Sequence, residues 1–430
     1  MPLNINVLVF PCGSEIGLEI HNALKFVKNI TLYGASSVDD HGKFVYRNYI
    51  PGIPNVDEDD FIEALNQVIE KYHIDYIFPA HDSVVLKLAR NKMNIKAEVL
   101  TSAPLTCEIC RSKKKTYEFF SGAAFVPRLY DNAAEVNDFP VFLKPDVGQG
   151  AKGIALARNK QELDYYLEKN HDLLILEYLP GREYTIDCFT DRHNKLKFVG
   201  TRERRRIKSG ISVNSISMKN DEKILEMAKT INEKLNFQGM WFFQVKEDAN
   251  GDLKLMEISP RIAGTMSLYR NKGINFPLLC LYDRLGYDVQ VIENEFEIEV
   301  DRALVNRFSA NITYKRVYID FDDTITVKGK VNPFTMMFLY QCLANEKELV
   351  LITKHEGEVY ETLKTLRIDP NIFEKVIHIP KDDEKYRYIV NDVPAIFIDD
   401  SFAERCKIKN HVGIPVFDID SLECLIDWRY

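Results

Sequence analysis

"FLKPDVGQGAKGI", residues 142–154, places Lys144 at the end of one apolar run and three glycines before the next. Gly148, Gly150 and Gly153 stand at spacings that allow backbone N–H groups to approach phosphate oxygens without side chains in between. A Walker loop would instead read GxxxxGK(S/T) and open a helix. The pattern predicts two strands joined by a glycine turn, which either covers a phosphate chain or is only a hairpin turn.

The composition of the whole chain is that of an ordinary soluble multidomain protein. Its 430 residues are enough for about two to four domains. Hydrophobic residues make up 46% and charged residues 28%, and the formal charge of −8 argues against nucleic acid or a membrane as a partner. The eight scattered cysteines predict reduced thiols. Without a signal-peptide core or a membrane-length apolar run, we expect a cytoplasmic protein, with its oligomeric state open and a homodimer included.

Residues 1–104 alternate between strand and helix patterns. The runs INVLVF, ITLYGASS, YIFPAHD and AEVLTS predict strands, and residues 61–71 and 84–89 predict helices between them. This alternation indicates a doubly wound α/β domain with a parallel sheet. The absence of GxGxxG gives no support to dinucleotide binding. His81 and Asp82 follow the third strand, where either a ligand site or a solvated loop pair is expected.

Residues 105–305 contain charged motifs in series. Lys113 begins a run of three lysines, which is either a solvated helix start or part of a phosphate site. The stretch LLILEYLPGREYTIDCF, residues 173–189, predicts a strand, a turn and an alternating strand. Backbone groups of such a connection suit an adenine edge, and Glu177 and Glu183 suit ribose hydroxyls or a metal.

Two later stretches place charged side chains on neighbouring strands. Arg202, Arg204 and Arg206 share one face of a predicted strand, as a triphosphate or carboxylate clamp or as a salt-bridged ribbon. Residues 240–261, MWFFQVKEDANGDLKLMEISPR, predict a hairpin with an Asn-Gly turn. Its arms carry Gln244 and Glu257, whose oxygens suit Mg²⁺, and Ser259 and Arg261 follow.

In this order the motifs resemble the ATP-grasp superfamily, most closely the branch of the carbamoyl-phosphate synthase large subunit. The resemblance covers residues 1–305 and implies a pre-ATP-grasp domain at 1–104 and a two-subdomain ATP-grasp of α+β type at 105–305. Implied nucleotide contacts are Lys113, Lys144, Gly148, Gly150, Gly153, Glu177, Tyr178, Leu179, Glu183 and Arg202.

The same resemblance implies a metal site beside the transferred phosphoryl group. Gln244 and Glu257 would bind Mg²⁺, with Mn²⁺ as an alternative, and Arg261 would face the phosphoryl. Ser259 departs from the family, which usually has Asn there, and a hydroxyl is a weaker ligand for a second metal. Near Gly264 the chain also lacks an arginine of the synthase, so carbamate chemistry is not expected.

After a predicted linker at residues 302–315, three apolar runs each end in polar residues. RVYIDFDDTIT contains Asp320 and Asp322, two apart on one face of a strand end, where they suit Mg²⁺ and a nucleophile. LVLITKH contains Thr353, and AIFIDDSFAER contains Asp399 and Asp400.

The set resembles a haloacid dehalogenase-like phosphatase over residues 314–430, a small Rossmann-like hydrolase domain. The resemblance implies Asp320 as nucleophile, Asp322 as general acid/base, Thr353 and Lys385 as phosphate ligands, and Asp320, Asp322, Asp399 and Asp400 at the metal. Lys381 is the alternative to Lys385. The intervals between the motifs are too short for a cap domain, so a capless site is predicted.

The combined prediction is an ATP-dependent carboxylate–amine ligase that works through an acyl phosphate, with an appended Mg²⁺-dependent phosphatase. Its partners would be a small carboxylate and an amine, or a phosphorylated substrate. Two alternatives stay open, namely an ATP-dependent kinase without ligation and a nucleotide-binding scaffold without turnover.

Overall fold

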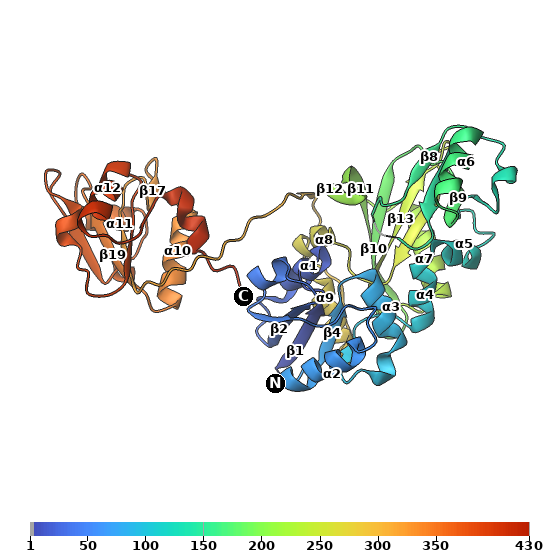
Figure 1. Cartoon of the computed structure of the whole chain (residues 1–430), viewed down its shortest axis with the longest axis horizontal. Coiled ribbons are helices and arrows are strands. Elements are labelled where there is room, and N and C mark those ends of the chain that lie inside the picture. Colours follow the sequence, from blue (N-terminus) through green and yellow to red (C-terminus); the bar gives the residue numbers. More distant parts are fainter. Residues whose placement is uncertain (1–3, 149, 430) are drawn as a thin grey trace. The chain divides into compact units, whose positions relative to one another are not determined.

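The computed structural model describes residues 4–148 and 150–429, which form two compact units. The first unit ends at residue 304 and the second runs from residue 305 to residue 429 (Figure 1). Residues 302–314 carry no helix or strand. Within the described residues, no helix is both long enough and apolar enough to span a bilayer.

The first unit begins with a parallel sheet of order β3-β2-β1-β4-β5. Its strands are β1 (Ile5–Phe10), β2 (Ile30–Ser36), β3 (Asn48–Pro51), β4 (Tyr76–Pro79) and β5 (Glu98–Val99). The connecting helices are α1 (Glu15–Leu24), η1 (His41–Phe44), α2 (Phe61–Tyr72), α3 (Asp82–Arg90) and η2 (Lys92–Asn94). The edge strand β3 was not predicted from the sequence, because its residues NYIP show no apolar run.

The two faces of this sheet bury different helices. Leu8 and Phe10 of β1 pack with α2 and α3, whereas Val7 and Val9 pack with α1. The second face is completed from far along the chain by α8 (Ser267–Asn271) and α9 (Phe276–Arg284). These two helices lie between residues 105 and 305, so that segment also contributes to the core of the N-terminal sheet.

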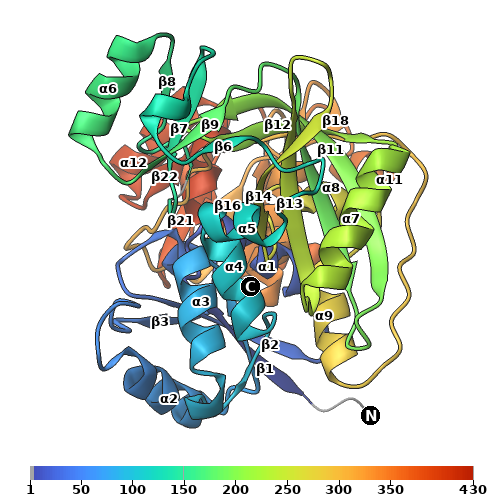
Figure 2. The ribbon, with the colours of Figure 1, turned by 90° about the vertical axis from the view of Figure 1, so that its right-hand side faces the viewer.

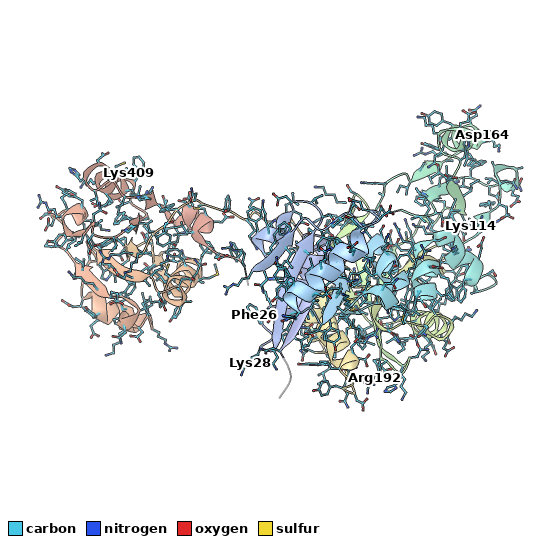
Figure 3. The ribbon with its side chains drawn as sticks, turned by 60° about the horizontal axis from the view of Figure 1, so that its bottom comes forward. Phe26, Lys28, Lys114, Asp164, Arg192 and Lys409 are labelled. Atoms are coloured by element: carbon cyan, nitrogen blue, oxygen red, sulfur yellow. The ribbon has the colours of Figure 1, made fainter. Side chains whose placement is uncertain are left out.

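A small antiparallel sheet of order β6-β9-β7-β8 follows. Its elements are β6 (Leu129–Tyr130), η3 (Ala133–Glu135), β7 (Val141–Pro145), β8 (Ala155–Ala157), α6 (Lys160–Lys169) and β9 (Leu173–Glu177). Figure 2 shows α6 beside β8, and Figure 3 marks Asp164 on α6 and Lys114 on α5 (Lys113–Phe119). The two predicted strands are thus present as β7 and β8, and the described residues between them, 146–148 and 150–154, carry no helix or strand.

A larger antiparallel sheet of order β14-β13-β10-β11-β12-β15 completes the first unit. Its strands are β10 (Glu183–Thr190), β11 (Leu196–Lys208), β12 (Ile211–Met218), β13 (Gly239–Glu247), β14 (Leu253–Ser259) and β15 (Glu299–Asp301). Residues of α4 (Pro104–Arg111) and α7 (Glu222–Lys234) cover one face, where Trp241 and Phe243 are buried. The other face is left to the polar groups described below.

The second unit is built on a parallel sheet of order β20-β19-β16-β21-β22. Its strands are β16 (Arg316–Ile319), β19 (Glu348–Thr353), β20 (Lys375–His378), β21 (Ala395–Ile398) and β22 (Val416–Phe417), with a hairpin of β17 (Thr326–Val327) and β18 (Lys330–Val331). Its helices are α10 (Pro333–Ala344), α11 (Val359–Thr365), η4 (Pro370–Ile372), η5 (Lys385–Tyr388), α12 (Phe402–His411) and η6 (Ile419–Leu425). Helices lie on both faces, because Val317 and Ile319 pack with α10 while Tyr318 packs with α12. This unit is therefore also a doubly wound α/β structure.

Candidate functional site

A pocket with a buried lysine lies where the small sheet meets the large one. Lys144, near the end of β7, donates hydrogen bonds to Tyr117 Oη at 2.7 Å and to the Met256 carbonyl at 3.1 Å. Burial, together with the nearby charge of Lys113, lowers the pKa of Lys144 to about 7. The pocket encloses about 430 Å³ of open space and is lined by Tyr117, Pro127, Phe142, Lys144, Leu176, Glu177, Tyr178, Leu179, Lys246, Leu255 and Met256.

The mostly apolar walls of this pocket come from α5, β7, β9 and β14 and from the connection of residues 178–182 between β9 and β10, here called the hinge. Glu177 is tied to the backbone, because its carboxylate accepts from the Arg128 N–H at 2.8 Å. Tyr178 and Leu179 line the pocket as the chain leaves β9. A flat aromatic ring with polar edges would fit between such walls and the backbone of the hinge.

The glycine loop is anchored to the start of α5. Ser112 caps this helix, and its hydroxyl donates to the Asp146 carboxylate at 2.8 and 2.9 Å. Lys113 Nζ donates to the Asp146 carbonyl at 3.2 Å, so Lys113 and Lys144 both lie at the loop. Arg111 donates to the Gly148 carbonyl at 3.3 Å. Gly150 and Gly153 have φ of 58° and 74°, conformations that favour glycine.

Gln244 and Glu257 face each other across β13 and β14, where the ladder pairs them directly. Gln244 Oε1 accepts from Arg204 Nη1 at 2.7 Å, and Arg204 also forms an ion pair with Glu183. A carboxylate and an amide oxygen at adjacent positions are a suitable donor set for Mg²⁺.

The arginines of β11 are all paired with carboxylates. Buried Arg202 forms a bidentate pair with Asp187, with Nε–Oδ2 at 2.7 Å and Nη2–Oδ1 at 3.2 Å. Arg206 is exposed and pairs with Asp301, beyond an irregularity of the β11–β12 ladder. Salt bridges therefore run along β11, as the prediction of a salt-bridged ribbon requires. A surface ribbon would leave all three arginines exposed, however, and Arg202 and Arg204 are buried and line a cavity.

This arginine cavity is larger than the pocket at Lys144. It contains about 910 Å³ of space and is open to solvent. Charged residues from the larger antiparallel sheet, from the N-terminal parallel sheet and from the segments next to them meet there, namely Glu15, Asp82, Arg202, Arg204, Glu257, Arg261 and Arg302. Thr185 Oγ1 also borders it and, within the described residues, is a buried oxygen without a hydrogen-bond partner. Glu15 pairs with Arg302 at 2.8 Å.

Arg261 is held by Asp82, which is the first residue of α3. The bonds Arg261 Nε–Asp82 Oδ1 and Arg261 Nη2–Asp82 Oδ2 are both 2.7 Å long, and Ser259 Oγ donates to Asp82 Oδ1 at 2.9 Å. Burial by itself raises the pKa of Asp82, but Arg261 and Ser259 outweigh it and hold that pKa well below its usual range. Asp82 is thus a half-buried ion-pair partner of Arg261 and not simply a solvated loop residue.

In the second unit, carboxylates gather at the carboxyl ends of β16 and β21. Asp320, Asp399 and Asp400 each offer an oxygen within 4.8 Å of the others. Buried Lys385 Nζ lies 2.6 Å from both Asp320 Oδ1 and Asp399 Oδ2. Burial and the neighbouring Asp399 raise the pKa of Asp320, while Lys385 opposes this. Lys381 is exposed and pairs with Glu356, so Lys385 is the lysine at this cluster.

Asp322 lies outside that three-carboxylate group. Its two carboxylate oxygens are 2.9 and 3.0 Å from His355 Nδ1, and His355 Nε2 is 3.0 Å from Thr362 Oγ1. Thr353, at the end of β19, is fully buried and its hydroxyl accepts from the His355 N–H. The side chain of Asp322 is therefore held by His355. The spacing of Asp320 and Asp322 in the sequence had predicted that both carboxylates lie together at the metal site.

Sequence reasoning left one residue of these sites open and missed two. Asp82 follows a strand of an open sheet, a recognised signal for a ligand site, but the sequence did not decide between this and a solvated loop. Tyr117 and His355 carried no signal, because an apolar helix face and a short loop normally contain such residues.

Comparisons with known proteins agree with this architecture. Residues 169–304 match a family model described as ATP-grasp in the biosynthetic pathway with Ter operon. A carbamoyl phosphate synthase large chain of Clostridium botulinum strain Langeland is 25% identical over 362 residues, covering 68% of this chain and 33% of that protein. The chain thus spans about a third of the length of this relative.

Two solved structures show the same fold at low identity. One is the biotin carboxylase domain dimer of Hydrogenobacter thermophilus 2-oxoglutarate carboxylase with MgADP, ADP and bicarbonate, with TM-score 0.57 and 16% identity over 70% of this chain and 74% of that one. The other is N5-carboxyaminoimidazole synthetase of Staphylococcus aureus with ADP, with TM-score 0.57 and 16% identity over 68% and 80%. Residues 169–304 therefore match an ATP-grasp family model, about two thirds of the chain shares the fold of these two structures, and carbamoyl phosphate synthase large chains are among its homologues.

Proposed function

We propose that residues 4–304 act as an ADP-forming ligase, which phosphorylates a carboxylate with ATP and passes the acyl phosphate to an amine. The observation that carries this proposal is Lys144, a buried lysine that donates hydrogen bonds to a phenol and to a backbone carbonyl. Neither of these two partners is charged, and the carboxylates of Glu257, Glu183 and Asp146 offset the burial of the Lys144 ammonium only in part, so a polyphosphate is a fitting ligand. The same class is supported by the names of the similar proteins, which are a carbamoyl phosphate synthase, a biotin carboxylase domain in complex with MgADP and a synthetase in complex with ADP.

In this proposal the nucleotide lies between the two sheets of the grasp. Adenine occupies the pocket at Glu177, Tyr178 and Leu179, and Glu183 is offered to the ribose. Lys113, Lys144 and the loop of Gly148, Gly150 and Gly153 hold the phosphates. Arg202, which is paired with Asp187 and lines the arginine cavity, would lie beside the phosphates.

Gln244 and Glu257 fit Mg²⁺, because their side chains offer oxygen donors from directly paired positions of β13 and β14, and both residues line the arginine cavity. Mg²⁺ supplies charge neutralisation on the phosphate oxygens when bound. The chain itself would hold the phosphoryl group with Arg261, which lines the arginine cavity and also a neighbouring cavity that contains Lys113 and Gly148.

The cavity of about 910 Å³ is proposed as the site of the carboxylate and the amine. Its arginines and the unpartnered Thr185 Oγ1 offer hydrogen-bonding groups to a small polar ligand. A carboxylate oxygen attacks the γ-phosphorus and ADP leaves. The amine nitrogen then attacks the acyl carbon, and inorganic phosphate leaves with the bond electrons. Closing the sheets over the site protects the acyl phosphate from water.

The test is ADP release by the full chain with Mg-ATP, measured against a panel of carboxylates with and without amines. A ligase requires both, a kinase requires no amine, and binding without ADP release indicates a scaffold. Glu257→Ala should abolish ADP release while leaving the thermal transition in place. Unchanged ADP release in this variant would remove Glu257 from the metal site.

For residues 305–429 we propose a Mg²⁺-dependent phosphatase of the haloacid dehalogenase-like type. The carboxylate cluster beside Lys385 supports it. Asp320 would attack phosphorus, Asp322 would protonate the leaving oxygen, and water would hydrolyse the aspartyl phosphate. Thr353 and Lys385 would hold the phosphoryl group, and Asp399 and Asp400 would complete the metal site. Hydrolysis of p-nitrophenyl phosphate by the full chain, with and without Mg²⁺, tests the activity.

A further inference from the structure

The contact between Asp82 and Arg261 joins two parts of the first unit that are 179 residues apart in sequence. Asp82 comes from the N-terminal sheet, at the start of α3, and Arg261 follows β14 of the large sheet. Both residues border the cavity of about 910 Å³ and also the neighbouring one that contains Lys113 and Gly148. The pair therefore stands at the junction of the proposed phosphate and acceptor regions.

The geometry fixes the plane of the Arg261 guanidinium. Nε and Nη2 bond to the two Asp82 oxygens, Nη1 donates to the Ile262 carbonyl at 3.0 Å, and the group lies over the Phe242 ring at 5.3 Å. These bonds, counted within the described residues, use three of the five guanidinium N–H groups. The remaining N–H groups are available to an oxygen in the cavities.

Ser259 belongs to the same arrangement. Its hydroxyl proton is committed to Asp82 Oδ1, the oxygen that also receives Arg261 Nε. A neutral hydroxyl is a poor Mg²⁺ ligand in comparison with carboxylate and amide oxygens. Ser259, which stands at the sequence position of a second metal ligand, thus donates its hydroxyl proton to the carboxylate that holds Arg261.

We propose that Asp82 is the positioning residue of Arg261 and that Ser259 completes this support instead of binding a second Mg²⁺. The N-terminal domain would then contribute directly to phosphoryl transfer by orienting a cation of the grasp. This inference rests on the proposed function, because it assigns Arg261 to the transferred phosphoryl group.

The experiment uses the full chain, Mg-ATP and the carboxylate–amine pair that gives ADP release. Asp82→Asn should lower kcat by about 100-fold, as expected for a misplaced catalytic group, while KM for Mg-ATP changes by less than about twofold. Glu19→Gln is the matched control, because Glu19 forms a similar bidentate pair with Arg270, at 2.7 and 3.2 Å, away from both cavities. It should lower the melting temperature to a similar extent but leave kcat unchanged.

Chemical rescue separates positioning from a merely structural role. Added guanidinium ion should restore part of the ADP release of Arg261→Ala in a saturable way, because Asp82 still binds the ion. The same ion should not rescue Asp82→Asn/Arg261→Ala. Equal rescue of both proteins would overturn the positioning role of Asp82.

The metal part of the inference has its own readout. Ser259→Ala should leave the Mg²⁺ concentration dependence of ADP release unchanged and lower kcat by less than Asp82→Asn. A raised Mg²⁺ requirement would make Ser259 a ligand and overturn that part. Normal ADP release by Arg261→Ala would reject the proposed role of Arg261 in phosphoryl transfer. No ADP release by the wild-type chain would reject the proposed ligase activity itself.

Discussion

At the scale of single residues, Lys144 links burial to ligand binding. Its side chain is charged in water, but in this pocket its pKa falls to about 7 because the side chain is buried and Lys113 is near. The neutral form therefore dominates above pH 7 in the ligand-free protein. Phosphate oxygens would reverse this, since they favour the ammonium form.

We predict that Mg-ATP binding takes up a proton at alkaline pH. With a free-state pKa of about 7, roughly 0.9 proton should be taken up at pH 8 and roughly 0.1 at pH 6. Calorimetry in buffers of different ionisation enthalpy measures the uptake. Lys144→Arg, which stays charged at both pH values, is the control and should bind without this uptake. Equal uptake by the variant would show that another group titrates.

Asp320 and Asp323 allow a matched comparison in the second unit. We predict that Asp320→Asn abolishes Mg²⁺-dependent phosphoester hydrolysis by the full chain, because the proposed nucleophile is removed. Asp323→Asn should keep activity and stability, since Asp323 is exposed and its φ of 51° suits asparagine equally well. Rates with p-nitrophenyl phosphate decide this. Activity that persists in Asp320→Asn would identify a different nucleophile.

At the scale of elements, the β7–β8 connection contains glycines with different tasks. A Cβ at Gly153 would lie 2.9 Å from Pro145 Cγ, and φ is 74°. At Gly148 the nearest atom would be 3.7 Å away, and φ is not in the left-handed region. The turn therefore requires glycine at position 153. At position 148 there is room for a methyl group in the ligand-free protein.

These glycines give a prediction with an internal control. Gly153→Ala should destabilise the first unit by about 1–2 kcal/mol, because it forces a left-handed residue and a close contact. Gly148→Ala should leave the melting temperature unchanged but weaken Mg-ATP binding, since the methyl group would stand between the backbone and the phosphates. Thermal unfolding and calorimetric titration measure the two effects. Normal ATP affinity in Gly148→Ala would place the phosphates elsewhere.

At the scale of the whole molecule, the chain consists of two units with separate cores. We predict two transitions in differential scanning calorimetry. A hundredfold excess of Mg-ATP over its dissociation constant should stabilise only the unit of residues 4–304, by about 2.7 kcal/mol. Lys144→Ala should remove this shift, whereas Asp320→Asn should retain it. A shift of both transitions would show that the units unfold together.

Local patterns in the sequence were sufficient for most of the architecture. The alternating strands and helices of residues 1–104, the glycine turn of residues 142–154 and the Gln244–Glu257 hairpin follow from periodicity and turn residues. Short strands such as β3 and β15 were not predicted, because their sequences show only weak patterns and they are strands only through pairing with a neighbouring strand.

The sequence by itself determined the kinds of elements and the polar residues at their ends, because these depend on neighbours a few positions away. Only the tertiary structure decided which charges are partnered. Asp82 meets Arg261 across 179 positions, and Lys385, rather than Lys381, reaches Asp320. Such pairs are set by the packing of sheets whose strands come from distant segments, and no local pattern encodes that register. The same packing buries Lys144 and so lowers its pKa, which a lysine in an unfolded chain would not show.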